Sequence, residues 1–308
     1  MVIFPERLTK GDTIGIISPS NPVTDEFKNQ FDQGVGLLEN LGFRIVIGKH
    51  VFSTSLMYAA SPFEKAEDIN LMFANPTIKA IICSQGGSTA NACLPYLDWI
   101  KIQKNPKIFM GISDITVLLN AIHKYTGLIT FHGYDVMWGF GNEPTNYDLS
   151  EFKRILVDAN TGDIPANGKR VTVRGGSAEG KLLGGNLNCL LKLAGTSYFP
   201  DFFESILLVE AINLKPEVCD YYFHQLKQIG VFDQIKGVII GFIDGLENDD
   251  NAPMQMEDIL LHITADYDFP ILKANDFGHN CPNTTFPIGG IANINADRRT
   301  IVLNRSVL

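Results

Sequence analysis

The sequence predicts an α/β protein with an N-terminal, mostly parallel sheet flanked by helices and a smaller C-terminal α/β domain with a mixed sheet. Three observations support this fold class. Apolar strand-like runs alternate with helical patterns in the first half, a polar and glycine-rich stretch follows, and the second half mixes helical patterns with a closing pair of strand-like runs. At 308 residues the chain is long for one core and comfortable for two domains of roughly 100–200 residues.

The first half alternates between strand and helix patterns, which is typical of parallel strands joined by helical crossovers. Five apolar runs are predicted to be strands: residues 13–18, 44–48, 78–84, 107–113 and 127–131. Helical patterns cover residues 26–42 and 62–75 between these runs. Ligands gather outside the carboxyl ends of parallel strands, so small and polar residues at those ends are candidates for a site. Three runs end in this way: Ser18-Pro19-Ser20, Gln85-Gly86-Gly87-Ser88 and Gly111-Ile112-Ser113-Asp114.

A stretch over residues 158–181 is rich in Gly, Asn and charge and has little helical periodicity, so we predict the domain link there. We expect an N-terminal domain over 1–157, a linker over 158–177 and a C-terminal domain over 178–308. In the C-terminal domain, "KLLGGNLNCLL" is interpreted as a strand-to-helix turn in which Asn186 caps the helix.

Composition excludes several classes of protein. The chain has a net charge of −9 and no basic cluster, which argues against nucleic-acid binding. Its five cysteines are scattered and no metal-ligand spacing occurs, so we expect reduced core cysteines, no metal and no cofactor. No signal peptide and no run of roughly 20 apolar residues is present, so we expect a cytoplasmic protein without a membrane partner.

The stretch "MGISDITVLL", residues 110–119, places a serine and an aspartate between a strand-like and a helix-like run. Ser113 or Asp114 could cap the helix, which is the commoner role for these residues. Alternatively, the turn could lift the Ser113 hydroxyl above the sheet as a nucleophile. A nucleophilic Ser113 requires a base and a third group to orient that base.

His279 is the strongest candidate base, because it follows the strand-like "FPILKAN" on a loop beside Gly278. His132, directly after a predicted strand, is a weaker candidate. A structural role is the alternative for both, and it is favoured for the other four histidines: His50, His123, His224 and His262.

Glu210 is the strongest candidate carboxylate, because it ends the apolar run "SILLVE", where a charge is costly unless it is paired or at the sheet edge. An ordinary strand-end charge facing water is the alternative. Glu217 and Asp220 rank lower, because acidic residues suit the start of the helix that is predicted there.

Gly86 and Gly87 form a turn in which the backbone can approach a substrate closely, since neither residue has a Cβ atom. Amides of this turn, with that of Asp114, could bind a developing oxyanion. A phosphate-binding turn is the competing interpretation, but the Gly-x-Gly-x-x-Gly and Walker patterns are absent.

The chain resembles the LD-carboxypeptidases, a serine-peptidase family that also contains the microcin C7 immunity proteins. The likeness runs through blocks in this order: "KGDTIGIISPSNP", "FEKAEDINLMFANPTIKAIICSQGGS", "PKIFMGISDITVLLNAI", "GLITFHG", "EGKLLGGNLNCLLKLAGT", "ILLVEAINLKP" and "FGHNCPNTTFPIG". The resemblance implies a catalytic triad of Ser113, Glu210 and His279. It also implies two domains meeting at a cleft and, frequently, a homodimer.

The substrate is less clearly indicated, because Gln85 stands where murein-trimming members usually have arginine. A murein tetrapeptide that loses its terminal D-alanine is the first expectation, with Gln85, Ser88 or nearby amides binding its carboxylate. The second is an aminoacyl-nucleotide toxin, for which Trp138 would supply an aromatic platform. Packing in the core or at its rim is the commoner role for Trp138 and for Trp99. A catalytically idle protein that binds peptides is the alternative of another class.

Overall fold

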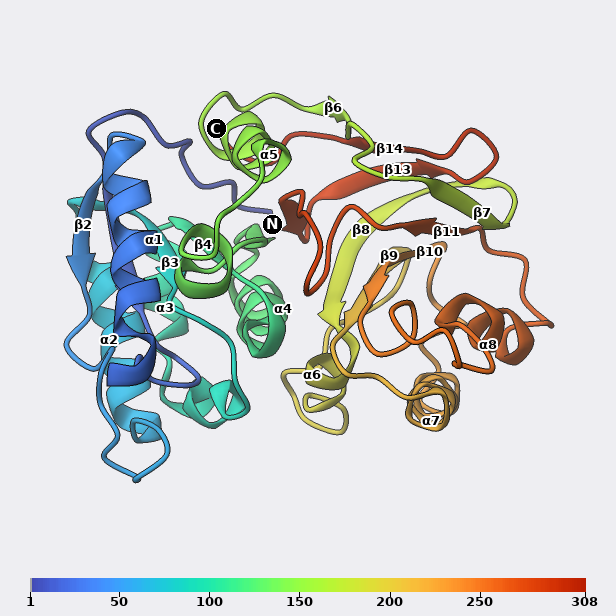
Figure 1. Cartoon of the computed structure of the whole chain (residues 1–308), viewed down its shortest axis with the longest axis horizontal. Coiled ribbons are helices and arrows are strands. Elements are labelled where there is room, and N and C mark those ends of the chain that lie inside the picture. Colours follow the sequence, from blue (N-terminus) through green and yellow to red (C-terminus); the bar gives the residue numbers. More distant parts are fainter. Residues whose placement is uncertain (1) are drawn as a thin grey trace.

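The computed structural model describes residues 2–308, and it has two sheets that lie side by side (Figure 1). The blue-to-green first half of the chain forms most of the six-stranded sheet, in the order β12-β5-β4-β3-β1-β2. The second half forms most of the eight-stranded sheet, in the order β6-β14-β13-β8-β9-β10-β11-β7. The predicted α/β class, with a largely parallel first sheet and a mixed second sheet, is confirmed.

The six-stranded sheet contains all five strands predicted for the first half. Its parallel strands are β1 (Thr13–Ile17), β2 (Arg44–Ile47), β3 (Ile78–Cys83), β4 (Ile108–Gly111) and β5 (Thr130–His132). The α-helices of this half are α1 (Lys28–Asn40), α2 (Pro62–Ala74), α3 (Trp99–Lys104), α4 (Thr116–Thr126) and α5 (Asn146–Leu156). All five residues of β1 are buried, as expected for a central strand covered on both faces.

A strand from the second half completes the first sheet. β12 (Phe286–Ile288) pairs antiparallel with β5, and Phe286 lies opposite His132. Three residues that include a proline carry almost no strand signal, so this pairing could not be predicted from local pattern. The last part of the chain is therefore built into both sheets.

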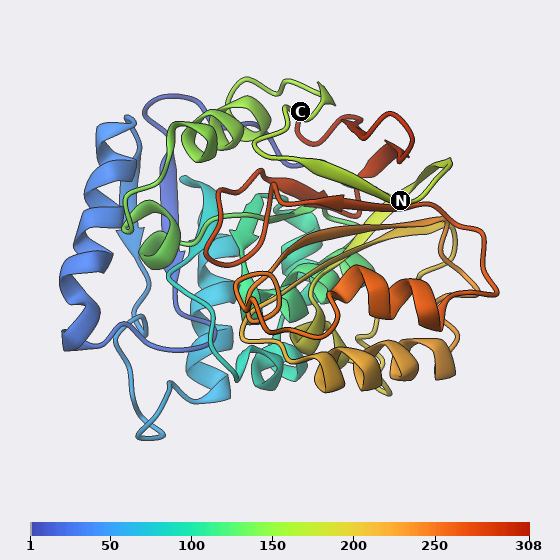
Figure 2. The same cartoon turned by 45° about the vertical axis from the view of Figure 1, so that its right-hand side comes forward.

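The eight-stranded sheet has a parallel centre with antiparallel edges. Its strands are β6 (Gly162–Asp163), β7 (Arg170–Arg174), β8 (Ser177–Asn186), β9 (Ser205–Ala211), β10 (Gly237–Ile243), β11 (Ile271–Ala274), β13 (Ile291–Asn295) and β14 (Thr300–Leu303). Its helices are α6 (Leu187–Leu191), α7 (Pro216–Gln228) and α8 (Met256–Ile263). Figures 1 and 2 show α7 and α8 on the same side of this sheet.

The stretch predicted as a linker contributes to the second sheet. β6 pairs with β14, and β7 pairs antiparallel with β11. The sequence of β7, "RVTVR", alternates valine with polar residues and has three β-branched residues at its centre, which is a strand signal that the surrounding polar composition hid. The predicted turn at the end of β8 is confirmed, because the side chain of Asn186 accepts a hydrogen bond from the Cys189 amide and caps α6.

Side-chain contacts join the two halves next to the turn between β4 and α4. The Asn120 side chain donates to the carbonyl of Gly184 at 2.8 Å and accepts from its amide at 3.0 Å. The Thr116 hydroxyl accepts from the Asn186 amide at 3.0 Å. These buried bonds fix α4 against the end of β8.

None of the helices in residues 2–308 combines the length and the apolar character needed to cross a bilayer.

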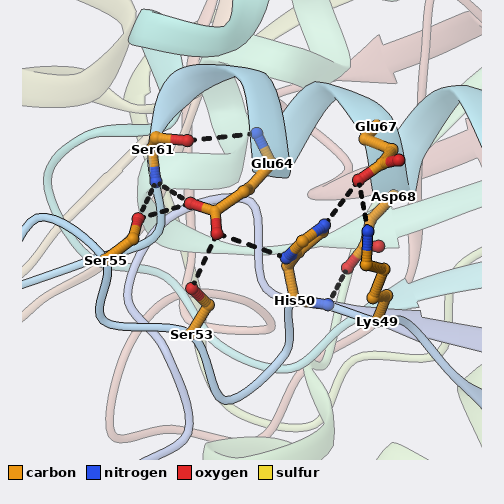
Figure 3. Close-up of polar contacts among 8 residues, drawn as sticks. All are labelled: Lys49, His50, Ser53, Ser55, Ser61, Glu64, Glu67 and Asp68. Carbon is orange, nitrogen blue, oxygen red and sulfur yellow. Dashed lines mark hydrogen bonds and ion pairs between the residues drawn. The ribbon is translucent and has the colours of Figure 1, made fainter.

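The start of α2 is fixed by a capping box, which Figure 3 shows together with the loop before it. The Ser61 hydroxyl accepts from the Glu64 amide at 3.3 Å, and the Glu64 carboxylate accepts from the Ser61 amide at 2.7 Å. Hydrogen bonds from Ser55 and Ser61 lower the pKa of Glu64 to about 2. The His50 ring lies between two carboxylates. Its Nδ1 is 3.5 Å from Oε1 of Glu64, and its Nε2 is 2.6 Å from Oε2 of Glu67.

Replacing Ser61 with alanine should lower the free energy of unfolding by about 1 kcal/mol, because one amide of the first helical turn loses its partner. Urea denaturation followed by circular dichroism measures this loss. Ser88→Ala is the matched control, since Ser88 is exposed and should change stability by less than about 0.5 kcal/mol. Equal losses in both variants would contradict the capping role.

Candidate active site

A cavity of about 740 Å³ lies where the two halves meet. The first half contributes Gly86, Gly87 and Ser113 to its lining, along with residues of the segment after β5. The second half contributes Ile212 and the loop 278–283, which includes His279. Two of the three residues that were expected to form a triad therefore face one space.

Ser113 occupies a sharp turn between β4 and α4. It begins the 3-10 turn η3 (Ser113–Ile115), and its φ of +64° lies in the left-handed region that residues with side chains rarely adopt. Such strain collects at functional sites, where the surrounding structure holds it. No capping hydrogen bond is made by Ser113 or Asp114 to this helix start, so the capping interpretation is wrong.

The Asp114 side chain instead stabilises the turn by accepting hydrogen bonds from other segments of the chain. Its buried carboxylate accepts from the Ser20 hydroxyl at 2.6 Å, the Ala90 amide at 2.8 Å and the Lys192 ammonium at 2.6 Å. Lys192 follows α6 in the second half and also donates to the carbonyl of Ser88. These bonds fix the turn that carries Ser113 to the first half of the chain, through Ser20 and Ala90, and to the second half, through Lys192.

Gly86 lies directly against Ser113. A Cβ atom on Gly86 would lie 2.6 Å from Cβ and 2.9 Å from Oγ of Ser113, and 3.3 Å from the Asp114 amide nitrogen. Gly87 has a φ of +145°, and a Cβ there would overlap the Asn21 side chain. The backbone of this turn therefore lies directly against the serine, and a side chain at either glycine would displace its neighbours.

His279 and Glu210 form a tight pair beside the cavity. Glu210, at the end of β9, is fully buried, and its Oε2 lies 2.6 Å from Nδ1 of His279. Because Nδ1 is engaged, Nε2 is the ring nitrogen that can accept a proton. Within residues 2–308, Ser113 Oγ and His279 line the same cavity without sharing a hydrogen bond. Contacts of this kind often tighten only when substrate is bound.

The charges of this pair stabilise each other. Burial lowers the pKa of His279, but the charge and hydrogen bond of Glu210 and the charges of Asp135 and Asp244 outweigh it, so the pKa lies above 6.5. Burial raises the pKa of Glu210, but His279 and His132 outweigh it and hold that pKa well below its usual range. Glu210 is therefore ionised wherever His279 titrates.

Asp135 is a cavity residue that the sequence reasoning missed. It caps η4 (Val136–Phe140), where its Oδ1 accepts from the amides of Trp138 and Gly139. Burial raises the pKa of Asp135 to about 7. The signal was available, because Asp135 follows the carboxyl end of β5, as Ser113 follows that of β4.

Of the residues expected to bind substrate, some line the cavity and others do not. Gln85 lines the cavity, but its amide donates to the Pro22 carbonyl at 2.7 Å and accepts from the Trp138 indole at 3.1 Å. Ser88 is exposed and stands outside the described lining. Trp138 lines the cavity and is 47% exposed, whereas Trp99, in α3, stacks on Tyr125 of α4.

Charged groups in the lining are mostly acidic. Besides His279 they are Asp135, Glu143 and Asp148, and the lining as described contains no lysine or arginine. No group of three or more His, Cys, Asp or Glu side chains in the described part of the chain is arranged to hold a metal ion.

Comparison with protein families gives two matches along the chain. Residues 14–133 match the LD-carboxypeptidase N-terminal domain, and residues 179–294 match the LD-carboxypeptidase C-terminal domain.

Curated relatives of similar length share about 30% of the sequence. The microcin C7 self-immunity protein MccF of Escherichia coli is 30% identical, over 98% of this chain and 95% of that protein. A probable murein peptide carboxypeptidase of Bacillus subtilis is also 30% identical, over the same shares. The murein tetrapeptide carboxypeptidase of Pseudomonas aeruginosa is 28% identical, over 92% of this chain and 94% of that protein.

Solved structures match over almost the whole chain. The structure of MccF in complex with glutamyl sulfamoyl guanosine superposes with a TM-score of 0.91 at 29% identity, covering 99% of both chains. An MccF-like protein from Bacillus anthracis gives a TM-score of 0.87 at 31% identity, covering 99% of this chain and 100% of that one.

Proposed function

The chain belongs to the LD-carboxypeptidase family of serine-type carboxypeptidases, and on this premise we propose that Ser113, His279 and Glu210 form its catalytic triad. One observation carries the proposal. A strained serine and a carboxylate-bound histidine, from opposite halves of the chain, line the same cavity.

In the proposed reaction, the Ser113 hydroxyl attacks the carbonyl carbon of the scissile amide, and Nε2 of His279 takes its proton. Glu210 holds the imidazole through Nδ1 and balances the positive charge that forms. Amides of Gly86 or Gly87 and of Asp114 bind the oxyanion. His279 then protonates the leaving amine, and water, deprotonated by His279, hydrolyses the ester on Ser113 and restores the hydroxyl.

The first substrate we propose is a murein tetrapeptide, cut before its terminal D-alanine. The names of two relatives at 28% and 30% identity support this class. Because the described residues of the lining include no lysine or arginine, neutral donors such as backbone amides would bind the substrate carboxylate. Gln85 would help to shape this carboxylate site, because its side chain donates to the Pro22 carbonyl and accepts from the Trp138 indole. An ammonium group on the substrate would meet Asp135, Glu143 and Asp148 favourably.

The second substrate class is an aminoacyl nucleotide. The half-exposed Trp138 in the cavity favours it, since an aromatic face can stack on a nucleobase. The structure of MccF bound to glutamyl sulfamoyl guanosine supports the same class.

Mass spectrometry of three reactions separates these classes. The purified chain is incubated with a murein tetrapeptide ending in D-alanine, its isomer ending in L-alanine, and an aminoacyl sulfamoyl-adenylate. We expect release of D-alanine from the first compound alone. Cleavage of the third alone would assign the nucleotide class, and no cleavage together with no labelling by a fluorophosphonate would favour an idle binding protein.

We also propose that the enzyme is cytoplasmic and that it forms a homodimer, which the family resemblance implies. Light scattering after size-exclusion chromatography should give twice the 34.0 kDa mass of one chain. A monomer at micromolar concentration would contradict the dimer.

The activity should fall as the pH drops through the pKa of His279, because the protonated imidazole cannot act as a base. Glu210→Gln should move this acidic limb to lower pH, since the charge that raises the pKa of His279 is lost. The measurement is the pH profile of kcat/KM, and it should show a lower maximum as well. Glu217→Gln, an exposed change on α7, should leave the profile unchanged. An acidic limb that stays in place in Glu210→Gln would contradict the assignment.

A further inference from the structure

His132 is a buried histidine that the proposed reaction does not use. It ends β5, and its Nε2 lies 3.8 Å from Oε1 of Glu210, with both side chains fully buried. Within the residues that the structure describes, both ring nitrogens of His132 and Oε1 of Glu210 are buried without a hydrogen-bond partner. Buried polar groups left in this state are costly, so a pair of them in contact calls for an explanation.

The surroundings of His132 leave Glu210 as its charged neighbour. His132 lies opposite Gly111 of β4 and Phe286 of β12, and the Phe277 ring meets it edge-on with centroids 5.8 Å apart. On the side of β8, a Cβ atom on Gly185 would lie 3.1 Å from Cδ2 of the ring. None of these four neighbours titrates.

The loop after β11 carries His279, which binds the other oxygen of the Glu210 carboxylate. The same loop carries Asp276, whose carboxylate is paired with Arg170 at 2.6 Å. Glu210 is thus placed between two imidazoles, one on each of its oxygens.

The geometry shows which ring nitrogen would donate. A neutral imidazole carries its one proton on Nε2 or on Nδ1, and Nε2 is the nitrogen that lies 3.8 Å from Oε1 of Glu210. A neutral His132 with its proton on Nε2 supplies a donor to Oε1 once the two atoms approach by roughly 1 Å.

We propose that His132, as the neutral Nε2–H tautomer, donates to Oε1 of Glu210 and so fixes the carboxylate that orients His279. It is a positioning residue, and the inference rests on the proposed catalytic roles of Glu210 and His279. Two donors from opposite sides hold the plane of a carboxylate, whereas one donor leaves it free to rotate.

The first test reads the tautomer without any turnover. Long-range ¹H–¹⁵N correlation spectra of the whole labelled protein report the protonation of both ring nitrogens, and His132→Gln identifies the His132 signals. We expect a protonated Nε2 and an unprotonated Nδ1 at the pH at which the enzyme is assayed. An imidazolium or an Nδ1–H tautomer at that pH would overturn the proposal.

The second test compares variants by their rate of labelling with a fluorophosphonate. His132→Phe keeps an aromatic ring without a donor, and it should label at least about tenfold more slowly. The pKa seen in its pH–rate profile should rise, because Glu210 then interacts with His279 alone. His132→Gln, whose amide reaches the Nε2 position, should recover most of the rate, whereas His132→Asn should not.

Each outcome separates positioning from packing. Equal losses in His132→Phe and His132→Gln, with an unchanged pH profile, would show that the ring only fills space and would overturn the proposal. If the wild-type protein does not label at all, the proposed triad fails, while the tautomer measurement still decides whether His132 donates to Glu210.

Discussion

Ser113→Ala is expected to lower kcat by at least about 10⁴-fold, because no other group at the turn can form the covalent intermediate. The free energy of unfolding should stay within about 0.5 kcal/mol of the wild-type value, since the Ser113 hydroxyl faces a cavity and caps no helix. Turnover of the preferred substrate and urea denaturation measure the two quantities.

Ser177→Ala is the matched control for this loss. Ser177 begins β8, is exposed and stands outside the cavity lining as described. The control should keep kcat within about twofold of the wild-type value. Activity in Ser113→Ala above one hundredth of the wild-type value would remove Ser113 from the mechanism.

Gly86→Ala should lower kcat/KM by about 10²-fold or more. The new Cβ atom would lie 2.6 Å from Cβ of Ser113, which is closer than packed carbon atoms can come, so the serine or the glycine turn must shift. A displacement of about 1 Å at a reacting atom costs about 10²-fold in rate. The same shift would move the proposed oxyanion amides away from the substrate.

Gly36→Ala separates this local effect from a general cost of replacing glycine. Gly36 lies within α1, and a Cβ atom there would have no neighbour within 4 Å. This control should keep full activity and gain about 1 kcal/mol in stability, since alanine favours helix. Wild-type activity in Gly86→Ala would show that the turn does not constrain Ser113.

The sequence predicted much of the site because strand ends are readable from local patterns. Ser113 and Glu210 each follow an apolar run, and the structure places both at the ends of strands, β4 and β9. His279 follows β11 on a loop, as its flanking glycine indicated. The five strands of the first half were predicted for the same reason.

Contacts made across long stretches of chain could not be predicted in this way. His132 and Glu210 are far apart in the sequence and meet only because the two sheets lie side by side. β12 joins the first sheet through pairing with β5, although it follows the strands of the second half. The residues of β7 are predicted as part of a linker, because the polar composition around them masks a short alternating pattern.

Mapping the fluorophosphonate adduct by peptide mass spectrometry tests most directly whether Ser113 is activated by the His279–Glu210 pair. We predict one adduct per chain, on Ser113, and a rate at least about 10²-fold lower in His279→Ala. An adduct on another serine, or an equal rate of Ser113 modification in wild-type and His279→Ala protein, would contradict the account.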